Sequence, residues 1–284
     1  MQNIRQLESL HSFLQAYQEN PRVSTRVLHK KYSHYRNRRS TTSLIREAKE
    51  KNILIGPRLW CNSGCDIEIY EHVNDPISLL ETVKQREEVT YATALIGDPS
   101  LICFKNGARV LTYAEAITPS FPAKKKITDI SLEREGKLEP DPYPQEWNET
   151  DWAVFHNMRD PTMSFMKVGQ KLGISWHTVK NHYEKIVRDC KTWILFLPKG
   201  YDSYQQVYLL FKTEYEINLR DELQKLDRTS LMYRFHDTIL LHLFLDEAFY
   251  HLHQYYRFFF EFSKKGIIHD LHVSIPVEGY SSFW

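Results

Sequence analysis

A proline-rich segment divides the sequence into two halves that share one order of elements. Residues 138–147, LEPDPYPQEW, carry three prolines within five positions, and proline fixes φ and lacks the backbone N–H that a helix needs. We therefore expect a stiff, extended connector over residues 138–148. On either side of it, a polar-rich helical segment precedes a series of strand and helix patterns. Repeats of this size indicate duplication of a pair of domains rather than a solenoid.

The composition indicates a folded protein in a reducing compartment. The 284 residues include 15 Phe, 17 Tyr and 6 Trp but only 10 Gly and 12 Pro, which excludes low complexity and global disorder. The four Cys are scattered and do not form the framework of a secreted disulfide protein. The N-terminus lacks the apolar core of a signal peptide, and the longest apolar runs are too short to span a bilayer. We expect a cytoplasmic protein without membrane contact.

The second half opens with a pattern typical of a helix-turn-helix. Gly169 places a small residue in the predicted second helix, and Gly173 permits the positive φ of a tight turn. Ser175 can then cap a third helix, whose inward positions recur at helical spacing. These positions are Val179, Tyr183, Ile186 and Cys190. The pattern predicts a helix-turn-helix domain over residues 149–192; the alternative is an ordinary packing unit of three helices.

The first half opens with a similar but less regular pattern over residues 1–58. Thr41, Ile45 and Ala48 form the inward stripe of a predicted third helix. The turn before this helix, residues 32–39, is longer than its counterpart in the second half and contains no glycine. We predict a first helix-turn-helix domain here, with a turn of different geometry.

Basic residues are concentrated in this first domain. The whole chain has a formal net charge of only +1, yet residues 22–58 contain eleven Lys and Arg against two Glu. The remainder of the chain therefore carries an excess of acidic residues. Such a local concentration is the electrostatic pattern of a nucleic-acid surface. The alternative is a solvated face that acidic residues cover from elsewhere in the fold.

Each half continues with a strand–helix–strand–strand–helix–strand pattern. This βαββαβ order is typical of a ferredoxin-like module, in which two helices cover one face of an antiparallel sheet. We expect such modules at residues 59–137 and 193–284, and hence an α+β fold in which two winged or helix-turn-helix modules alternate with two sheet modules. In the first module the predicted elements are residues 66–73, 76–86, 89–95, 101–105, 110–117 and 127–132. In the second they are residues 206–213, 218–226, 231–236, 238–245, 247–262 and 272–277.

This plan and three motifs resemble the Lrp/AsnC, or feast/famine, family of transcription regulators. Residues 164–175, SFMKVGQKLGIS, together with Thr178 and Val179, are similar to that family's helix-turn-helix. Residues 264–272, KKGIIHDLH, resemble its link from the last helix to the last strand, and residues 96–99, IGDP, resemble its glycine-bearing turn. The resemblance implies DNA-binding transcription regulation, a sheet module that dimerises, and often a small effector such as an amino acid.

The chain departs from the family pattern in three ways. It holds two copies of the usual domain pair, so the implied assembly is either a homodimer or a pseudo-dimer within one chain. The first helix-turn-helix lacks the glycine turn, and the second sheet module has residues 235–238, FHDT, where the family has a glycine-bearing turn. The effector-binding residues that the resemblance implies are Gly97, Asp98, His236 and Asp237.

Contact with double-stranded DNA would place each third helix in the major groove, with basic side chains and capping hydroxyls on the phosphates. The Asn181 amide suits adenine, and the Lys180 ammonium suits guanine or phosphate. We expect Trp176 to pack into the protein rather than to stack on bases. The predicted DNA-binding residues are Arg36, Asn37, Arg38, Arg39, Thr42, Ser43 and Arg46 in the first domain, and Ser175, His177, Thr178, Lys180 and Asn181 in the second.

A metal site is the first alternative. Six of the 13 His lie in the last 49 residues, and imidazole is a common metal ligand. However, His251 and His253 point about 200° apart on a helix, and no recognisable ligand spacing completes them. Cys61 and Cys65, spaced C-x3-C, can bind a metal or sense redox state, but two unpaired thiols are the simpler interpretation. We predict neither a metal nor a cofactor.

An enzyme is the second alternative, because the siroheme decarboxylases share the same two-module plan. His251, His253 and Arg257, beside Tyr255 and Tyr256, suggest a tetrapyrrole pocket. No motif matches that enzyme, and the sequence lacks a Walker loop, a dinucleotide-binding glycine pattern and a nucleophile elbow. We therefore expect a regulator without catalytic residues. An interaction scaffold whose helix-turn-helix no longer binds DNA is the third possibility.

Overall fold

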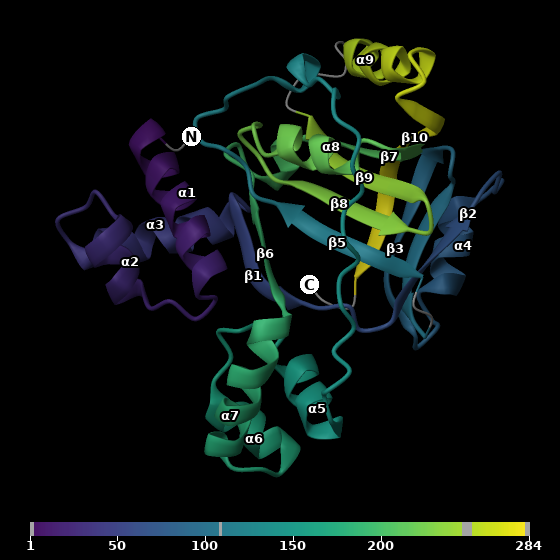
Figure 1. Cartoon of the computed structure of the whole chain (residues 1–284). Helices are drawn as coiled ribbons and strands as arrows, with labels where there is room; N and C mark the ends of the chain where they lie inside the picture. Colours follow the sequence, from purple (N-terminus) through teal and green to yellow (C-terminus); the bar gives the residue numbers. More distant parts are fainter. Residues whose placement is uncertain (1–2, 108–109, 246–251, 282–284) are drawn as a thin grey trace. The chain divides into compact units, whose positions relative to one another are not determined.

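The computed structural model describes residues 3–107, 110–245 and 252–281. The chain forms two compact units, one from Met1–Cys61 and Pro142–Asp202 and the other from Asn62–Asp141 and Ser203–Trp284. Each unit therefore combines a segment from both halves of the sequence (Figure 1). Short 3-10 turns lie at Ile127–Asp129 (η1), Val187–Asp189 (η2) and Tyr201–Ser203 (η3).

The first unit contains the helices of both predicted helix-turn-helix domains. The first domain consists of α1 (Ile4–Glu19), α2 (Thr25–Tyr32) and α3 (Arg38–Glu50), followed by strand β1 (Leu54–Trp60). The second consists of α5 (Glu149–Asn157), α6 (Phe165–Leu172) and α7 (Trp176–Ile186), followed by strand β6 (Lys191–Phe196). Strands β1 and β6 pair with each other in an antiparallel two-stranded ribbon. The strands that follow the two helical domains are thus joined within one chain.

The turn of the second domain has the geometry that its residues predict. Gly173 has a φ of 69° and ends α6 in the left-handed region, which favours glycine. Ser175 caps α7 by accepting a hydrogen bond from the Thr178 N–H. A Cβ on Gly169 would lie 2.7 Å from the Ile174 carbonyl oxygen, so only glycine lets the turn pack this closely on α6. The predicted inward residues Val179, Tyr183 and Ile186 are buried.

The second unit is built on one antiparallel eight-stranded sheet of order β2-β4-β3-β10-β7-β9-β8-β5. The first half of the chain supplies β2 (Cys65–Tyr70), α4 (Pro76–Val83), β3 (Val89–Gly97), β4 (Leu101–Asn106) and β5 (Leu111–Ile117). The second half supplies β7 (Gln205–Thr213), α8 (Glu216–Leu223), β8 (Ser230–Phe235), β9 (Thr238–Leu245), α9 (Leu252–Lys264) and β10 (Ile268–Ser281). The second half therefore has the expected βαββαβ order, and its strands lie in the order β10-β7-β9-β8.

The first half does not complete the same pattern. Residues 110–117, predicted as a helix, contain strand β5, and residues 127–132, predicted as a strand, contain only the turn η1. The physical reason is a nonlocal pairing: β5 forms a ladder with β8 from the second half, in which Ala114 lies opposite Tyr233. This tertiary pairing overrides the helix propensity of its Ala and Glu residues.

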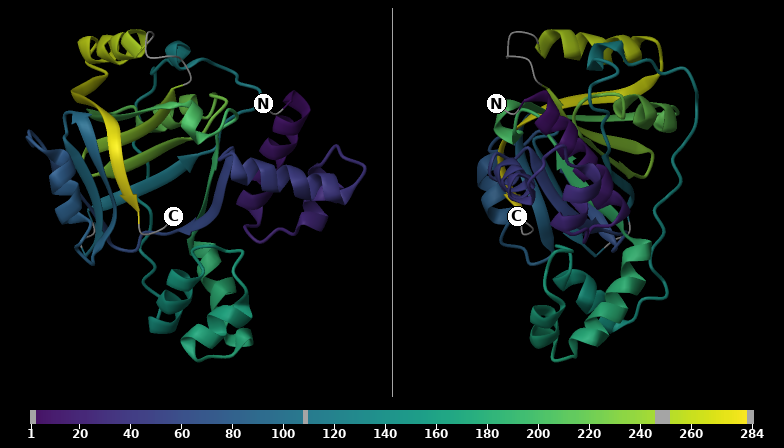
Figure 2. Two further views of the ribbon diagram at one scale, coloured as in Figure 1. Left: turned by 180° about the vertical axis from the view of Figure 1, so that it is seen from behind. Right: turned by 90° about the vertical axis from the view of Figure 1, so that its left-hand side faces the viewer.

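Strand β10 joins the contributions of the two halves. It pairs with β3 on one side and with β7 on the other, and Figure 2 shows it as the long yellow strand crossing the sheet. The outermost strands β2 and β5 also contact each other. The Phe104 ring on β4 lies 5.0 Å from the Tyr233 ring on β8, measured between centroids. The sheet is therefore curled, so that its two edges approach.

The hydrophobic core of this unit lies between the sheet and its helices. Helices α8 and α9 pack on the second-half strands through Leu219, Leu223, Phe259 and Phe262. After β5, backbone N–H groups of the chain donate hydrogen bonds to side chains of α8. Asn218 accepts from the Glu133 and Arg134 N–H groups, and Glu216 accepts from the Leu138 N–H. The extended connector thus begins well before the proline-rich segment.

None of the described helices combines the length and apolarity that crossing a membrane requires.

Candidate functional site

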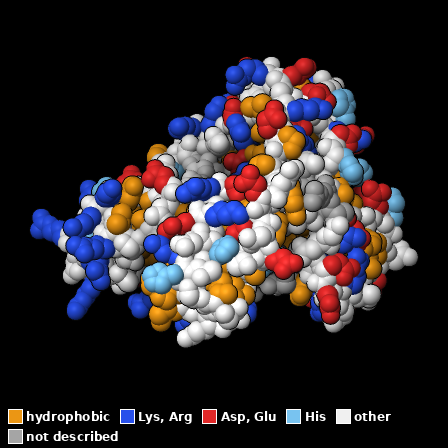
Figure 3. All heavy atoms as spheres, turned by 60° about the horizontal axis from the view of Figure 1, so that its bottom comes forward, with side chains coloured by type: hydrophobic (Ala, Val, Ile, Leu, Met, Phe, Trp, Pro, Cys, Tyr) orange, Lys and Arg blue, Asp and Glu red, His pale blue; other side chains and the backbone are white. Residues whose placement is uncertain are grey.

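The first helix-turn-helix carries a strongly basic exposed surface. Its exposed cations are Arg26, Lys30, Lys31, Arg36, Arg38, Arg39, Arg46, Lys49 and Lys51. Figure 3 shows Lys and Arg side chains gathered over this domain, on the left. Arg46 pairs with Glu50 at 3.8 Å and Lys51 with Glu47 at 4.0 Å, in solvent-exposed pairs that balance two of these nine charges. The surface therefore retains a strong positive potential.

This positive charge is greatest at the N-terminus of α3. Asn37 caps the helix by accepting from the Arg39 N–H at 2.9 Å, and the first turn contains no acidic residue. The free N–H groups and the helix dipole attract anions at this end, and Arg36, Arg38 and Arg39 are all exposed around it. Within the described chain, none of these three guanidinium groups has a protein partner. The arrangement is suited to phosphate groups.

A buried hydroxyl fixes the turn that precedes this helix. Thr41 is fully buried, and its Oγ1 lies 3.0 Å from His29 Nδ1 and 2.9 Å from Ser33 Oγ. The Tyr35 hydroxyl accepts a hydrogen bond from the Gln6 amide at 3.2 Å. A polar network therefore holds this turn in place of the glycine found in the second domain. Of the other predicted contact residues, Thr42 is exposed and Ser43 is half-buried.

The second helix-turn-helix presents a less basic surface. Ser175 and Thr178 bond to each other at the start of α7 (2.9 Å), and Lys180 pairs with Glu184 at 3.5 Å. His177 and Asn181 are exposed. The expectation for Trp176 is wrong: its side chain is 43% exposed and stacks on His177. The reason is its position in the first turn of α7, where it points away from the core that Val179 begins.

A buried carboxylate binds α7 to α5. Asp151 is fully buried and lies 2.6 Å from His182 Nδ1 and 2.6 Å from Lys185 Nζ. Burial alone raises the pKa of Asp151, but the hydrogen bonds from His182 and Lys185 outweigh it, and the pKa is lowered. The Lys185 ammonium is thereby held against the carboxylate on α5.

Two arginines of the first domain are directed toward the second domain. Arg22 donates to the Pro161 and Met163 carbonyl oxygens, the latter at 2.8 Å, and its guanidinium lies 4.1 Å from the Phe165 ring centroid. Arg58 forms an ion pair of 3.1 Å with Asp160. These contacts, together with the β1–β6 ribbon, hold the two helix-turn-helix domains in one unit.

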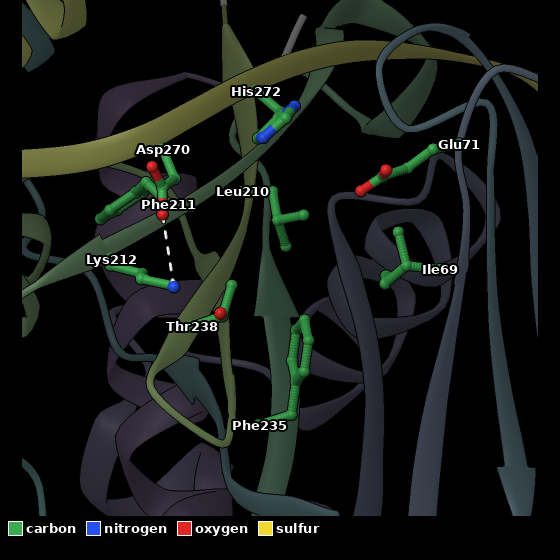
Figure 4. Close-up of a pocket in the computed structure, with 9 residues that line it drawn as sticks. All are labelled: Ile69, Glu71, Leu210, Phe211, Lys212, Phe235, Thr238, Asp270 and His272. Atoms are coloured by element: carbon green, nitrogen blue, oxygen red, sulfur yellow. Dashed lines mark ion pairs between the residues drawn. The ribbon is translucent and has the colours of Figure 1, made fainter.

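The second unit contains a pocket of about 310 Å³ at the rim of the curled sheet. Its floor is apolar, with Ile69 on β2, Leu210 on β7 and Phe235 on β8 (Figure 4). Its polar groups come from four segments and are Glu71, Lys212, Thr238, Asp270 and His272. Lys212 lies 3.3 Å from both Asp270 and Asp237, so its charge is already balanced. The pocket carries more negative than positive charge.

The predicted effector residues lie beside this pocket rather than in its lining. Asp98 bonds to His272 Nδ1 at 2.8 Å, and Asp237 pairs with Lys212. Gly97 has a φ of 120°, and a Cβ there would collide with the Val273 carbonyl. His236 is exposed and takes a φ of 50°, in the left-handed region that favours glycine. The lining residues Asp270 and His272 lie in the segment 264–272 that resembles the family's link to the last strand, but no pattern in the sequence places them beside Lys212, because β7 and β10 meet only through the strand pairing.

The residues of the tetrapyrrole alternative are only partly described. His251 lies outside the described residues, and His253 and Tyr255 lie in α9 without described side chains. Arg257 is exposed and Tyr256 is half-buried. Among the described residues, no three His, Cys, Asp or Glu side chains gather as ligands for a metal ion.

Comparison with solved structures shows which known fold the chain shares. The chain superimposes on the crystal structure of the siroheme decarboxylase NirDL with a TM-score of 0.54, covering 96% of this chain and 92% of that one at 11% sequence identity. The chain has the NirDL fold. The same enzyme in complex with an iron-uroporphyrin III analogue also gives a TM-score of 0.54, at 10% identity. The likeness to NirDL shows the fold, an α+β fold with antiparallel sheets, which agrees with the fold class expected from the sequence but not with the order of elements expected in the first half.

Comparisons of sequence add no further relative. No model of a known protein family and no curated protein sequence matches the chain. At 11% identity the likeness to NirDL establishes the shared fold and no shared activity.

Proposed function

We propose that the chain is a DNA-binding regulator of Lrp/AsnC type, and that its first helix-turn-helix makes the principal contact with duplex DNA. The observation that carries the proposal is the cluster of exposed, unpaired Arg36, Arg38 and Arg39 at the N-terminus of α3. Phosphate contacts dominate the affinity of proteins for DNA. The comparisons with known proteins add no support for DNA binding, so the proposal rests on this charge and geometry.

In this mechanism α3 enters the major groove and its basic N-terminus lies against the phosphates. The side chains of Thr42, Ser43 and Arg46 follow along the helix and face the base edges. The second helix-turn-helix adds a weaker contact through Ser175, His177, Thr178, Lys180 and Asn181. The pocket of the second unit accepts a small effector.

The test compares two variants of equal charge. We expect R36A/R38A/R39A to lose nearly all affinity for a fluorescently labelled duplex at low salt, as measured by anisotropy. The matched control is R257A/K264A/K265A, which removes three exposed cations from the second unit and leaves the affinity largely unchanged. Equal affinity of the two variants would contradict the assignment to α3.

A tetrapyrrole enzyme is the second candidate function. It is favoured by the fold that the chain shares with NirDL over nearly its whole length. A substrate for decarboxylation carries carboxylate groups, whereas the pocket of the second unit offers Glu71 and Asp270 against Lys212. This charge balance disfavours an anionic ligand. Titration with iron-uroporphyrin III and with siroheme tests the candidate: a shifted absorption spectrum, followed by release of carbon dioxide from siroheme, would establish the enzyme.

A further inference from the structure

The ribbon that joins the two helix-turn-helix domains ends on a pair of cysteines. In the β1–β6 ladder Leu59 lies opposite Thr192 and Trp60 opposite Lys191. Continuing this antiparallel register by one residue places Cys61 opposite Cys190. Both cysteines are free, and their thiols share a hydrogen bond.

The surroundings hold the two thiols together. Cys61 is 3% exposed and belongs to the core that contains Trp147 and Tyr183, while Cys190 packs against the same core from a half-buried position. Opposed residues in antiparallel strands have Cα atoms about 4.5 to 5.5 Å apart, which lies inside the range of about 4.4 to 6.8 Å that a disulfide requires. The pair can therefore be bridged with little movement of the backbone.

The other two cysteines have no such arrangement. The thiol of Cys65, which the C-x3-C spacing groups with Cys61, is directed to the Asp66 carbonyl oxygen at 3.6 Å. Cys103 is fully buried in strand β4 of the second unit. The local spacing in sequence thus groups Cys61 with Cys65, whereas the continued strand register and the shared hydrogen bond group it with Cys190.

We propose that Cys61 and Cys190 form an oxidisable dithiol, which a peroxide converts to a disulfide that covalently links β1 to β6. One thiolate attacks an oxygen of the peroxide, and the O–O bond breaks to give a sulfenic acid and hydroxide, which takes up the proton released by that thiol and becomes water. The second thiol then attacks the sulfenic sulfur and displaces its oxygen as water, forming the S–S bond. Two thiols and one hydrogen peroxide thus give one disulfide and two water molecules.

The same contacts set the rate of this reaction. The hydrogen bond from Cys61 and burial raise the pKa of the Cys190 thiol. Because the thiolate is the reactive form, Cys190 becomes a better nucleophile as the pH rises.

The test uses the full chain, folded and treated with hydrogen peroxide. Trypsin releases Cys61 and Cys65 together in the peptide of residues 59–84, and Cys190 in the tripeptide of residues 189–191. We expect the non-reducing digest to contain these two peptides joined, and a reductant to separate them. The C65S variant should give the same joined product, which assigns the bond to Cys61. A disulfide inside the peptide of residues 59–84, or free thiols after prolonged treatment, would overturn the proposal.

A second measurement uses the wild-type protein, with C190S as its control. The bond closes a long loop of the chain, which reduces the entropy of the unfolded state. The oxidised protein should therefore unfold at a higher temperature than the reduced protein, and C190S should show no shift upon the same treatment. An equal midpoint for oxidised and reduced wild-type protein would contradict a bond between β1 and β6.

Discussion

The Arg22 guanidinium lies 4.1 Å from the centroid of the Phe165 ring and joins two segments that are far apart in the sequence. Arg22 precedes α2 of the first helix-turn-helix, and Phe165 begins α6 of the second. A planar guanidinium over an aromatic face, with carbonyl acceptors at its edge, is a favourable contact when it is partly removed from water. The spacing of the two domains thus depends on one side chain as well as on the β1–β6 ribbon.

Removing this contact should destabilise the first unit. We expect Arg22→Ala to lower the free energy of unfolding by about 1 to 3 kcal/mol, because it loses the ring contact and leaves two carbonyl groups without their donor. Urea denaturation measures the change. Arg26→Ala, which removes an exposed arginine from α2, should change stability by less than about 0.5 kcal/mol. Similar losses for both variants would contradict the role given to Arg22.

Gly169 should resist substitution by even one methyl group. In Gly169→Ala the new Cβ would lie 2.7 Å from the Ile174 carbonyl oxygen, and the turn must move to admit it. We expect a loss of about 1 to 3 kcal/mol in thermal or chemical unfolding. The neighbouring exposed variant Gln170→Ala serves as the control and should be close to neutral. A stable Gly169→Ala protein would show that the turn is more open than described.

A buried ion pair ties the connector to the sheet. Arg234 Nη1 lies 2.8 Å from Glu216 Oε2 and also donates to the Leu138 carbonyl. Glu216→Ala leaves the Arg234 charge buried and unpaired, so we expect a loss of about 3 to 5 kcal/mol. The matched control is Glu214→Ala, which breaks the exposed pair with Lys137 at a cost below about 1 kcal/mol. If urea denaturation gave similar losses of unfolding free energy for Glu216→Ala and Glu214→Ala, the buried pair would not contribute more stability than the exposed one.

His242 should make the stability depend on pH. Burial lowers the pKa of His242 to about 3, while the unfolded chain keeps a value near 6.5. The unfolded state therefore binds the proton first, and stability is full above about pH 6.5 and falls as the pH drops toward 3. The expected contribution is a slope of about 1.4 kcal/mol per pH unit.

The His242→Leu variant tests this dependence. Its unfolding free energy, measured from pH 6.5 to pH 4, should show a shallower slope than the wild type, even though the variant loses the hydrogen bond to Gln206. His269→Gln, which changes an exposed imidazole, should keep the wild-type slope. An unchanged slope in His242→Leu would mean that other groups carry the acid sensitivity.

Features that depend on neighbouring residues could be predicted from the sequence. The turn at Gly173, the cap at Ser175 and the βαββαβ order of the second half are all set by local chemistry and periodicity. The basic surface around α3 was also evident, because it is contiguous in sequence.

Features that depend on distant pairing could not be predicted. Strand β5 pairs with β8 from the other half, so residues 110–117 give no local sign of being a strand. The pocket brings together Ile69, Lys212 and His272 from three strands. The opposition of Cys61 and Cys190 follows only from the register of β1 and β6. In each case the residues that meet lie at least 60 positions apart in the sequence, so local periodicity does not reveal their pairing.

The salt dependence of binding to duplex DNA tests the central claim most directly. If six basic side chains of the first helix-turn-helix contact phosphate, a plot of log affinity against log salt concentration should fall with a slope of about −5. The unmodified protein, measured by anisotropy on a labelled duplex from low to physiological salt, should give this slope. A flat plot, or no binding at the lowest salt, would contradict DNA binding by the first helix-turn-helix. A shift of the tetrapyrrole absorption spectrum upon addition of the protein would then favour the enzyme.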